Sequence, residues 1–477
     1  MVVGEVARPV EVLVVGGGPG GYTAAARAAE LGREVVLVER DRLGGVCLNA
    51  GCIPSKALIT AANDLERIAA LGERGISASP TLDLAGVQAW KRSVVEGLVR
   101  GVRQLLAKVE VVEGTARLLD PHRVAVESAD RVSHFRFEHA ILAAGSRPVA
   151  LEALPVDGER VLDSTAALEL EEVPATVAVV GGGYVGIELS QAMRRFGSAV
   201  SVIDRHERLM SREDDDVCEA LRSLLEDEGI DLLLHAQITR VSGTSGQSVR
   251  ITIEQHGTEK TLEGSHVLVA AGRTPNTEGL GLEVAGVEVT DRGYIKVNER
   301  LQTTAPGVWA IGEVAGSPQF THISVDDFRV VHDNLIGVDH ATTGRHVPYC
   351  LFTDPELARV GLSEHDAQVR GMPYRVFKVP MEANLRARTL SETRGFLKAL
   401  VAADGDRILG FTAFGVGAAE MMSAVQIAMI AGLPYTALRD AVLTHPTLVE
   451  GLIPLFSSVA SAHNGAEATR TTSVGMR

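Results

Sequence analysis

Residues 10–21 read VEVLVVGGGPGG, a short run of mostly β-branched apolar residues followed at once by a cluster of glycines. An alanine-rich stretch with helical character covers residues 22–31, and a second apolar run covers residues 34–39. This order of strand, glycine turn, helix and strand predicts a βαβ unit, the building block of an α/β fold.

The glycines of this unit match a dinucleotide-binding fingerprint. Gly16, Gly18 and Gly21 fit the pattern G-x-G-x-x-G, in which glycines allow a tight turn and let a pyrophosphate approach the helix N-terminus. Glu39 lies 23 positions after Gly16, a spacing at which an acid can bond the ribose hydroxyls. With the predicted strand and helix around them, these residues predict a dinucleotide site.

The same unit occurs a second time. Residues 176–186 read TVAVVGGGYVG, and a predicted helix to residue 196 and a strand over residues 199–204 follow. Asp204 lies 23 positions after Gly181, which repeats the earlier spacing. Two units imply two bound dinucleotides. A flavoprotein that uses a nicotinamide needs that number, whereas a simple dehydrogenase needs one.

Two cysteines follow the first unit. Residues 44–56 read GGVCLNAGCIPSK, so Cys47 and Cys52 are five positions apart. In an ideal helix such positions lie about 7.5 Å apart along the axis, whereas a disulfide needs Cα atoms about 4.4–6.8 Å apart. The pair therefore predicts a distorted turn, which Asn49, Ala50 and Gly51 can supply. Strained, accessible disulfides are typically the labile and catalytic ones.

Two other roles for the pair fit the sequence less well. A structural zinc site usually needs four ligands, and no further Cys or His lies close by in the sequence. A stabilising disulfide across so short a loop gains little and is unusual inside a cell. The spacing therefore favours a redox pair. Cys218 and Cys350 lie far from it, and we expect them to be buried, inert thiols in a reducing cytoplasm.

Length and charge exclude several classes of protein. A chain of 477 residues predicts three or four domains at roughly 100–200 residues each. A net charge of −15 and the lack of a basic cluster argue against nucleic acid as a partner. The N-terminus shows no basic region followed by an apolar core, so we expect no signal peptide. No uninterrupted apolar run approaches the ~18 residues of a membrane span, so we expect no membrane contact.

Over residues 10–455 these motifs resemble the class I flavin pyridine nucleotide-disulfide oxidoreductases, typified by dihydrolipoamide dehydrogenase and related to glutathione and mercuric reductases. The resemblance implies an α/β fold with two Rossmann-like domains and an α+β dimerisation domain, in a homodimer whose subunits share each active site. It implies an FAD domain (1–150), an NAD domain (151–272), a central domain (273–345) and an interface domain (346–458). Residues 459–477 are rich in Ala, Ser and Thr, and this composition predicts a mobile tail.

The resemblance also implies the cofactor sites. FAD is assigned to Gly16, Gly18, Gly21, Glu39, Lys56, Gly114, Ala116 and Gly145, to Gly312 and Glu313 of a second motif over residues 304–313, and to Thr321 and His322. The nicotinamide nucleotide is assigned to Gly181, Gly183, Tyr184, Gly186, Asp204, Arg205, Gly272 and Arg273. The family usually ends its second FAD motif with Asp. Glu313 is expected either to keep that role with a small backbone shift or to hold the flavin more loosely.

Further residues match the family's catalytic groups. His445 and Glu450 resemble its acid/base pair, in which a carboxylate orients a histidine that the other subunit supplies to the disulfide. Lys56 lies four residues after Cys52 on one helical face, and the resemblance pairs it with Glu188 beside the flavin. Because thiolates are the active species, we expect a helix N-terminus and a neighbouring cation to lower the pKa of the reactive thiols.

The resemblance implies oxidation of dihydrolipoamide by NAD, or of another dithiol, with a 2-oxoacid dehydrogenase complex as a possible partner. Asp204 favours NAD because a carboxylate repels the 2′-phosphate of NADP. Arg205 and His206 leave NADP open, since glutathione reductases carry basic residues at these places to bind that phosphate.

One stretch departs from dihydrolipoamide dehydrogenases, which usually show Met-Leu-Ala-His near the flavin. Residues 319–329 read QFTHISVDDFR, and this resembles relatives of mercuric reductase, including copper-reducing flavoenzymes of the oxidant response. A metal-ion or quinone reductase therefore stays open as an alternative, as does a flavin redox sensor. Mercuric reductase itself is disfavoured, because no vicinal Cys pair lies near the C-terminus. No resident metal site is predicted.

Overall fold

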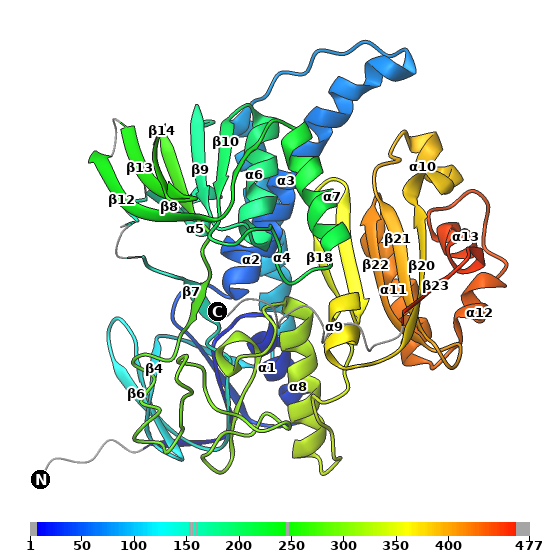
Figure 1. Cartoon of the computed structure of the whole chain (residues 1–477). Coiled ribbons are helices and arrows are strands. Elements are labelled where there is room, and N and C mark those ends of the chain that lie inside the picture. The colour runs from blue at the N-terminus through cyan, green and yellow to red at the C-terminus, as the bar shows by residue number, and fades with distance from the viewer. Residues whose placement is uncertain (1–6, 152–153, 155, 159–160, 245–247, 464–477) are drawn as a thin grey trace, which may run out of the picture. The chain divides into compact units, whose positions relative to one another are not determined.

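The computed structural model describes residues 7–151, 154, 156–158, 161–244 and 248–463 (Figure 1). The chain forms two compact units, each assembled from three segments. The first unit contains residues 1–61, 81–172 and 270–345, and the second contains residues 62–80, 173–269 and 346–477. The predicted FAD and central segments thus lie mainly in the first unit, and the predicted NAD and interface segments in the second.

A seven-stranded sheet organises the first unit, with the order β3-β2-β1-β6-β5-β4 and with β17 also paired to β6. Strands β3, β2, β1, β6 and β17 pair in parallel, whereas β4, β5 and β6 form an antiparallel ribbon. The bounds are β1 (Arg8–Val15), β2 (Val35–Glu39), β3 (Glu110–Glu113), β4 (Thr115–Asp120), β5 (Arg123–Glu127), β6 (Val132–Leu142) and β17 (Val308–Ala310). A short ribbon, β7 (Ser146–Pro148) with β16 (Arg273–Pro275), completes the unit.

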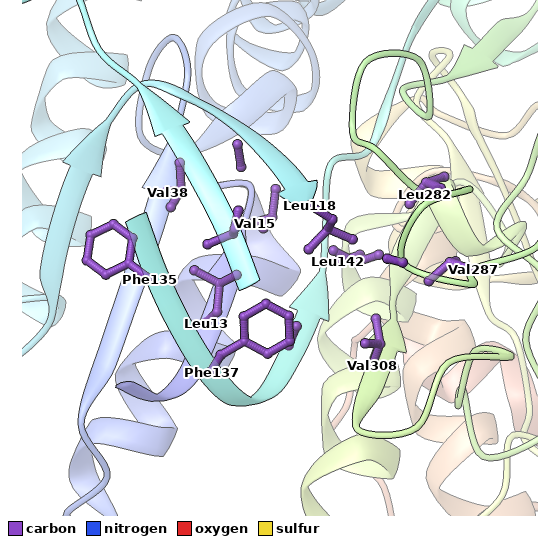
Figure 2. Close-up of a cluster of buried hydrophobic side chains, with 14 of the residues drawn as sticks. Leu13, Val15, Val38, Leu118, Phe135, Phe137, Leu142, Leu282, Val287 and Val308 are labelled. Carbon is purple, nitrogen blue, oxygen red and sulfur yellow. The ribbon is translucent and has the colours of Figure 1, made fainter. Parts of the chain in front are cut away.

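The central strand β1 is buried on both faces, which explains its continuous apolar sequence. Leu13 and Val15 pack with Leu118, Leu142 and Val308 in the cluster of Figure 2. The alternate residues of β1 face the opposite cluster, which contains the alanines of α1 (Pro19–Glu30) and apolar residues of α8 (Thr321–Leu335). Helices α1 and α8 lie side by side in Figure 1.

The first glycine motif forms the turn between β1 and α1, as predicted. Gly21 allows the closest approach, because a Cβ atom there would lie 1.8 Å from the carbonyl oxygen of Gly16. Gly186 stands in the same relation to Gly181 in the second motif, with a distance of 1.9 Å. Both predicted βαβ units are therefore present, with α1 after β1 and α6 (Tyr184–Phe196) after β9 (Thr176–Val180).

The second unit contains a parallel and two antiparallel sheets. Strands β11 (Asp231–Leu233), β10 (Ala199–Ile203), β9 and β15 (His266–Val269) run parallel in this order, and β12 (Ala236–Thr244), β13 (Ser248–Gln255) and β14 (Thr258–Gly264) form an antiparallel sheet. The six-stranded sheet has the order β18-β19-β22-β21-β20-β23. Its strands are β18 (Tyr349–Leu351), β19 (Glu356–Gly361), β20 (Tyr374–Pro380), β21 (Phe396–Ala402), β22 (Ile408–Gly415) and β23 (Ser461–His463).

Further helices accompany these strands, and the helix over residues 52–70 contributes to both units. Helices α2 (Gly45–Ala50), α3 (Cys52–Ala70) and α4 (Leu84–Leu105) follow the first βαβ unit. In the second unit, α7 (Asp215–Asp227) follows β10, whereas α9 (Glu364–Val369), α11 (Ala418–Ile430) and α13 (Leu452–Ser457) accompany the six-stranded sheet. Helix α11 packs on β19 and β22 (Figure 1). The α/β fold with two dinucleotide-binding motifs and a C-terminal α+β region is confirmed.

The structure bears on two predictions made from the sequence, the mobile tail and the lack of a membrane span. The predicted tail begins at residue 459, but Ser461–His463 form β23 and pair with β20, while residues 464–477 lie outside the described residues. One helical run, Gly45–Arg74, reaches the length and mean hydropathy of a membrane span, although polar residues interrupt it. Its most apolar window is 44% buried inside the protein, and core helices meet the same criterion.

Candidate active site

The two reactive cysteines lie where one helix ends and the next begins. Cys47 is the third residue of α2, and Cys52 is the first residue of α3. Gly51 forms the break between them, and a Cβ atom there would lie 2.9 Å from the carbonyl oxygen of Val46. Asn49 ties the short helix down by donating to the carbonyls of Leu43 and Gly45, at 2.9 Å each. The predicted distorted turn is thus a break between two helices.

Both thiols contact one hydroxyl group. Among the described residues all four cysteines, Cys47 and Cys52 included, are drawn as free thiols. Thr321 Oγ1 donates to Cys47 Sγ at 3.2 Å and lies 3.5 Å from Cys52 Sγ. Thr321 begins α8, far along the chain from the cysteines. Sequence reasoning assigned Thr321 to FAD and missed this contact. Its only signal was the departure of residues 319–329 from the Met-Leu-Ala-His stretch expected of dihydrolipoamide dehydrogenases.

The expectation of a lowered thiol pKa is wrong for Cys47 in the reduced pair. The hydrogen-bonded thiol of Cys52 raises the pKa of Cys47 first, and burial raises it further. Thr321 and Lys56 act in the opposite direction but do not outweigh these two causes. The helix-terminus argument overlooked that each thiol disfavours a negative charge on its neighbour.

The two glycine motifs hold their acids in the same way. Glu39 accepts from the N–H of Gly17 at 2.6 Å and from the N–H of Asp41 at 2.8 Å. Asp204 accepts from the N–H of Gly182 at 2.6 Å and from the N–H of His206 at 2.8 Å. Each acid therefore closes its glycine turn and stands at the carboxyl end of the second strand of its unit, where a ribose is expected.

Both helices after these turns suit an anionic ligand. In the described structure, no side chain caps the N-terminus of α1 or α6, whose N-cap residues are Gly18 and Gly183. Neither helix has an acidic residue in its first turn. The N–H groups without a side-chain cap and the positive end of the helix dipole are the donor set that a pyrophosphate requires. The residues present therefore fit two dinucleotides.

The other residues assigned to FAD lie in the first unit. Gly114 follows β3 and donates its N–H to the carbonyl of Glu39 at 2.9 Å, and Ala116 is buried in β4. Gly145 lies between β6 and β7. Lys56 lies on α3 and His322 on α8, where the His322 ring stacks on Phe320 with centroids 5.4 Å apart.

Glu313 makes a polar cluster that the sequence did not predict. Its carboxylate accepts from the hydroxyl of Ser146 and from Arg273 Nε, the latter at 3.2 Å. Arg273 also donates to the Ser146 hydroxyl at 2.6 Å and to the Ser146 carbonyl at 2.8 Å. Gly272 and Arg273, both assigned to the nicotinamide nucleotide, belong to the first unit, whereas the other residues of that set belong to the second.

Asp327 makes a second set of polar contacts to the second FAD motif, residues 304–313. The N–H of Gly312 donates to Asp327 Oδ2 at 2.7 Å, and Arg345 Nη1 donates to Asp327 Oδ1 at 2.6 Å. Asp327 is fully buried in α8. Its sequence neighbourhood was noted only as a departure from the family, although a buried acid needs such partners. The hydrogen bond from Gly312 fixes the start of the 3₁₀ turn Gly312–Ala315 against α8, and Arg345 neutralises the buried carboxylate.

In the second unit, the predicted acid/base pair is assembled. His445 Nδ1 lies 3.2 Å from Glu450 Oε1, and the N–H of Thr447 donates to Glu450 Oε2 at 2.9 Å. The bond from Thr447, followed by that from His445, holds the pKa of Glu450 below its ordinary value. The His445 side chain is 64% exposed, so its ring is open to a partner on the surface of this unit.

The remaining predicted residues of the second unit surround its glycine turn. Tyr184 begins α6, and its ring meets Tyr349 edge to face with centroids 5.6 Å apart. Arg205 is exposed, next to Asp204. Glu188 is buried in α6, and its carboxylate accepts from the N–H of Phe352 at 2.9 Å. Because Lys56 belongs to the first unit, its pairing with Glu188 stays a prediction.

Comparison with known proteins identifies the family. The family described as pyridine nucleotide-disulphide oxidoreductase matches residues 10–327, and its dimerisation domain matches residues 347–454. The chain belongs to this family. As a pyridine nucleotide-disulphide oxidoreductase it is an enzyme that acts on sulfur groups and uses FAD and NAD(H), and its C-terminal region is a dimerisation domain.

Individual oxidoreductases of the family are similar along most of the chain. Dihydrolipoyl dehydrogenase of Geobacillus stearothermophilus is 40% identical, over 94% of this chain and 96% of the relative, and that of Bacillus subtilis is 37% identical over the same shares. Among solved structures, the Cu(II) complex of the HOCl-induced flavoprotein disulfide reductase RclA from Escherichia coli is 34% identical. It superimposes with a TM-score of 0.86, covering 94% of this chain and 99% of the other.

Proposed function

We propose that this oxidoreductase is a dihydrolipoamide dehydrogenase, which converts dihydrolipoamide and NAD⁺ to lipoamide, NADH and a proton. The observation that carries the proposal is the pair Cys47 and Cys52, held side by side within reach of the Thr321 hydroxyl. The identity of 36–40% to dihydrolipoyl dehydrogenases over 94–98% of the chain supports it. FAD, when bound, accepts the two electrons of the dithiol and passes them to NAD⁺.

The residues of this chain supply the thiol chemistry. His445 of a second copy takes the proton of one substrate thiol, and the thiolate attacks Cys47 Sγ of the oxidised pair. The Cys47–Cys52 bond breaks, and Cys52 leaves as the thiolate. The second substrate thiol loses its proton and displaces Cys47, which closes the disulfide of lipoamide and leaves both cysteines reduced. The substrate gives up two electrons and two protons in total.

Reversal of this reaction provides the test. We would measure anaerobic NADH oxidation with lipoamide as the acceptor, comparing the wild type with Cys47→Ser and with Cys218→Ser as a buried-thiol control. The proposal expects rapid turnover in the wild type and in Cys218→Ser, and none in Cys47→Ser. Flavin reduction by NADH with no lipoamide turnover in the wild type would rule the assignment out.

A second candidate is a reductase of Cu(II) or of a quinone. The similarity to the RclA Cu(II) complex and the residues 319–329, which depart from dihydrolipoamide dehydrogenases, favour it. The same assay with Cu(II) or a quinone in place of lipoamide distinguishes the two. Turnover with these acceptors but not with lipoamide selects the second candidate. A flavin redox sensor predicts slow turnover with every acceptor.

We further propose that the protein acts in the cytoplasm as a homodimer, with each active site built from both copies, and that it serves a 2-oxoacid dehydrogenase complex. The dimerisation domain and the exposed His445–Glu450 pair support the shared site. Co-purification with lipoylated proteins tests the complex. A monomeric protein with full activity would contradict the shared site.

A further inference from the structure

One hydroxyl group serves both reactive sulfur atoms. Thr321 Oγ1 donates to Cys47 Sγ at 3.2 Å and lies 3.5 Å from Cys52 Sγ, with which either atom can be the donor. A threonine hydroxyl has one hydrogen and two acceptor lone pairs. It can therefore accept from the Cys52 thiol while it donates to Cys47, or turn its hydrogen toward Cys52 when that sulfur carries the charge.

The position of Thr321 strengthens this role. Thr321 is the first residue of α8, a helix of 15 residues whose first turn contains no acid and whose N-cap residue, Phe320, provides no side-chain cap. The positive end of the helix dipole therefore lies at the residue that bonds the sulfurs. The Ser324 hydroxyl donates to the carbonyl of Thr321 at 2.8 Å, which helps to hold this first turn.

A hydrogen-bond donor at this place stabilises a negative charge on Cys47 that other groups oppose. Cys47 is partly buried, and its neighbour Cys52 and burial both oppose a negative charge on its sulfur. The two groups that favour the charge are the Thr321 hydroxyl, through its hydrogen bond, and Lys56, through its positive charge. A hydrogen bond to a charged group is stronger than one between neutral groups, so the hydroxyl stabilises the thiolate more than the thiol.

We propose that Thr321 is a positioning residue that directs its single hydroxyl hydrogen to whichever sulfur of the Cys47–Cys52 pair is the thiolate, and so sets the nucleophilicity of Cys47. The inference rests on the proposed redox role of the pair, but not on the identity of the acceptor.

The experiment compares Thr321→Val, which has the same shape without the hydroxyl, with Thr321→Ser, which keeps the hydroxyl. The FAD-loaded protein is reduced anaerobically with one equivalent of NADH and alkylated with iodoacetamide across a range of pH. Mass spectrometry of peptides then gives separate rates for Cys47 and Cys52. Ser324→Ala is the matched control, because that hydroxyl lies in the same turn but bonds a backbone carbonyl.

In Thr321→Val we expect Cys47 alkylation to slow about tenfold near neutral pH, with the pH profile displaced upward by about one unit. Thr321→Ser and Ser324→Ala should follow the wild type. Identical profiles for Thr321→Val and the wild type would overturn the inference, as would an equal displacement in Ser324→Ala. If Thr321→Val fails to keep its flavin, Thr321→Ala repeats the test with a smaller side chain.

This readout separates the inference from the proposed function. A protein that does not turn over lipoamide but shows the displaced profile retains the role of Thr321 and loses only the substrate assignment. A protein that turns over lipoamide normally, with profiles that coincide, retains the assignment and loses the role of Thr321.

Discussion

The ammonium nitrogen of Lys398 lies 2.8 Å from Asp214 Oδ2, although the Lys398 side chain is completely buried. Asp216 and Glu364 also contact this nitrogen, at 2.7 and 2.9 Å. Burial by itself lowers the pKa of Lys398, but the carboxylates, Asp214 first, outweigh burial and raise the pKa well above its ordinary value. The three carboxylates lie close enough together to hold a metal ion, and the ammonium group supplies the positive charge there.

The first prediction concerns the stability that this cluster provides. We expect Lys398→Met to lower the free energy of unfolding by about 3–5 kcal/mol, because it removes the cation from the buried Asp214 and from two partly buried carboxylates. Lys378→Met is the matched control. Lys378 bonds Asp216 as well, at 2.5 Å, but is 41% exposed, so we expect a loss below about 1 kcal/mol. Urea unfolding curves measure both, and equal losses would contradict the role of burial.

The second prediction concerns acid. Burial raises the pKa of Asp216, but Lys378 and Lys398 outweigh it and lower the pKa below its ordinary value of 3.8. A carboxyl with a lowered pKa in the folded state stabilises the fold above its ordinary pKa and loses that effect as the pH falls through the folded value. We expect Asp216→Asn to be less stable than the wild type at pH 7. Urea unfolding at decreasing pH should show that the difference in the free energy of unfolding between the wild type and Asp216→Asn becomes smaller below about pH 4.

The third prediction concerns the acid/base pair. Replacing His445 by Gln should slow lipoamide turnover roughly 10²–10⁴-fold, the usual contribution of a general base. Glu450→Gln should have a smaller effect, because an amide can still accept from Thr447 but no longer holds the imidazole with a charge. Stopped-flow reduction of the flavin by NADH should stay unchanged in both variants. If this half-reaction slows equally, the pair has a structural role instead.

The fourth prediction concerns coenzyme choice. His206 Nδ1 lies 2.7 Å from Asp204 Oδ1, so the imidazole screens the acid that would repel a 2′-phosphate. Removing it in His206→Ala should lower the rate with NADPH relative to NADH by a few-fold, and Asp204→Ala should raise that ratio. Steady-state kinetics with both nucleotides check this. If the ratio of the NADPH rate to the NADH rate is unchanged in both variants, Asp204 and His206 do not determine the choice of coenzyme.

The fifth prediction separates two roles for Arg273. Its bonds to Ser146 and Glu313 indicate that it supports the second FAD motif, whereas the sequence assigned it to the nicotinamide nucleotide. We expect Arg273→Met to lose FAD more readily during gel filtration and to keep the wild-type KM for NADH once FAD is restored. A raised KM with unchanged FAD content would instead support the assignment made from the sequence.

The residues that sequence reasoning placed correctly in the fold belong to local patterns. These patterns are the glycine turns, the helices that follow them and the acids 23 positions later. Each depends on residues that are close in sequence, so it can be predicted without the tertiary structure. The position of Arg273 could not be predicted from local patterns. It follows the second nucleotide motif in sequence, but β16 pairs with β7, and this places the guanidinium beside Glu313.

The amino-acid sequence alone was sufficient for the α/β class, the two dinucleotide motifs, the cysteine pair and the family, because glycine conformation, apolar periodicity and motif spacing are properties of short segments. Only the tertiary structure decided which distant groups meet. Thr321 is 274 positions from Cys47, and Lys398 is 184 positions from Asp214. A hydrogen bond requires its atoms to be placed within a few tenths of an ångström, and packing of the whole chain sets that placement.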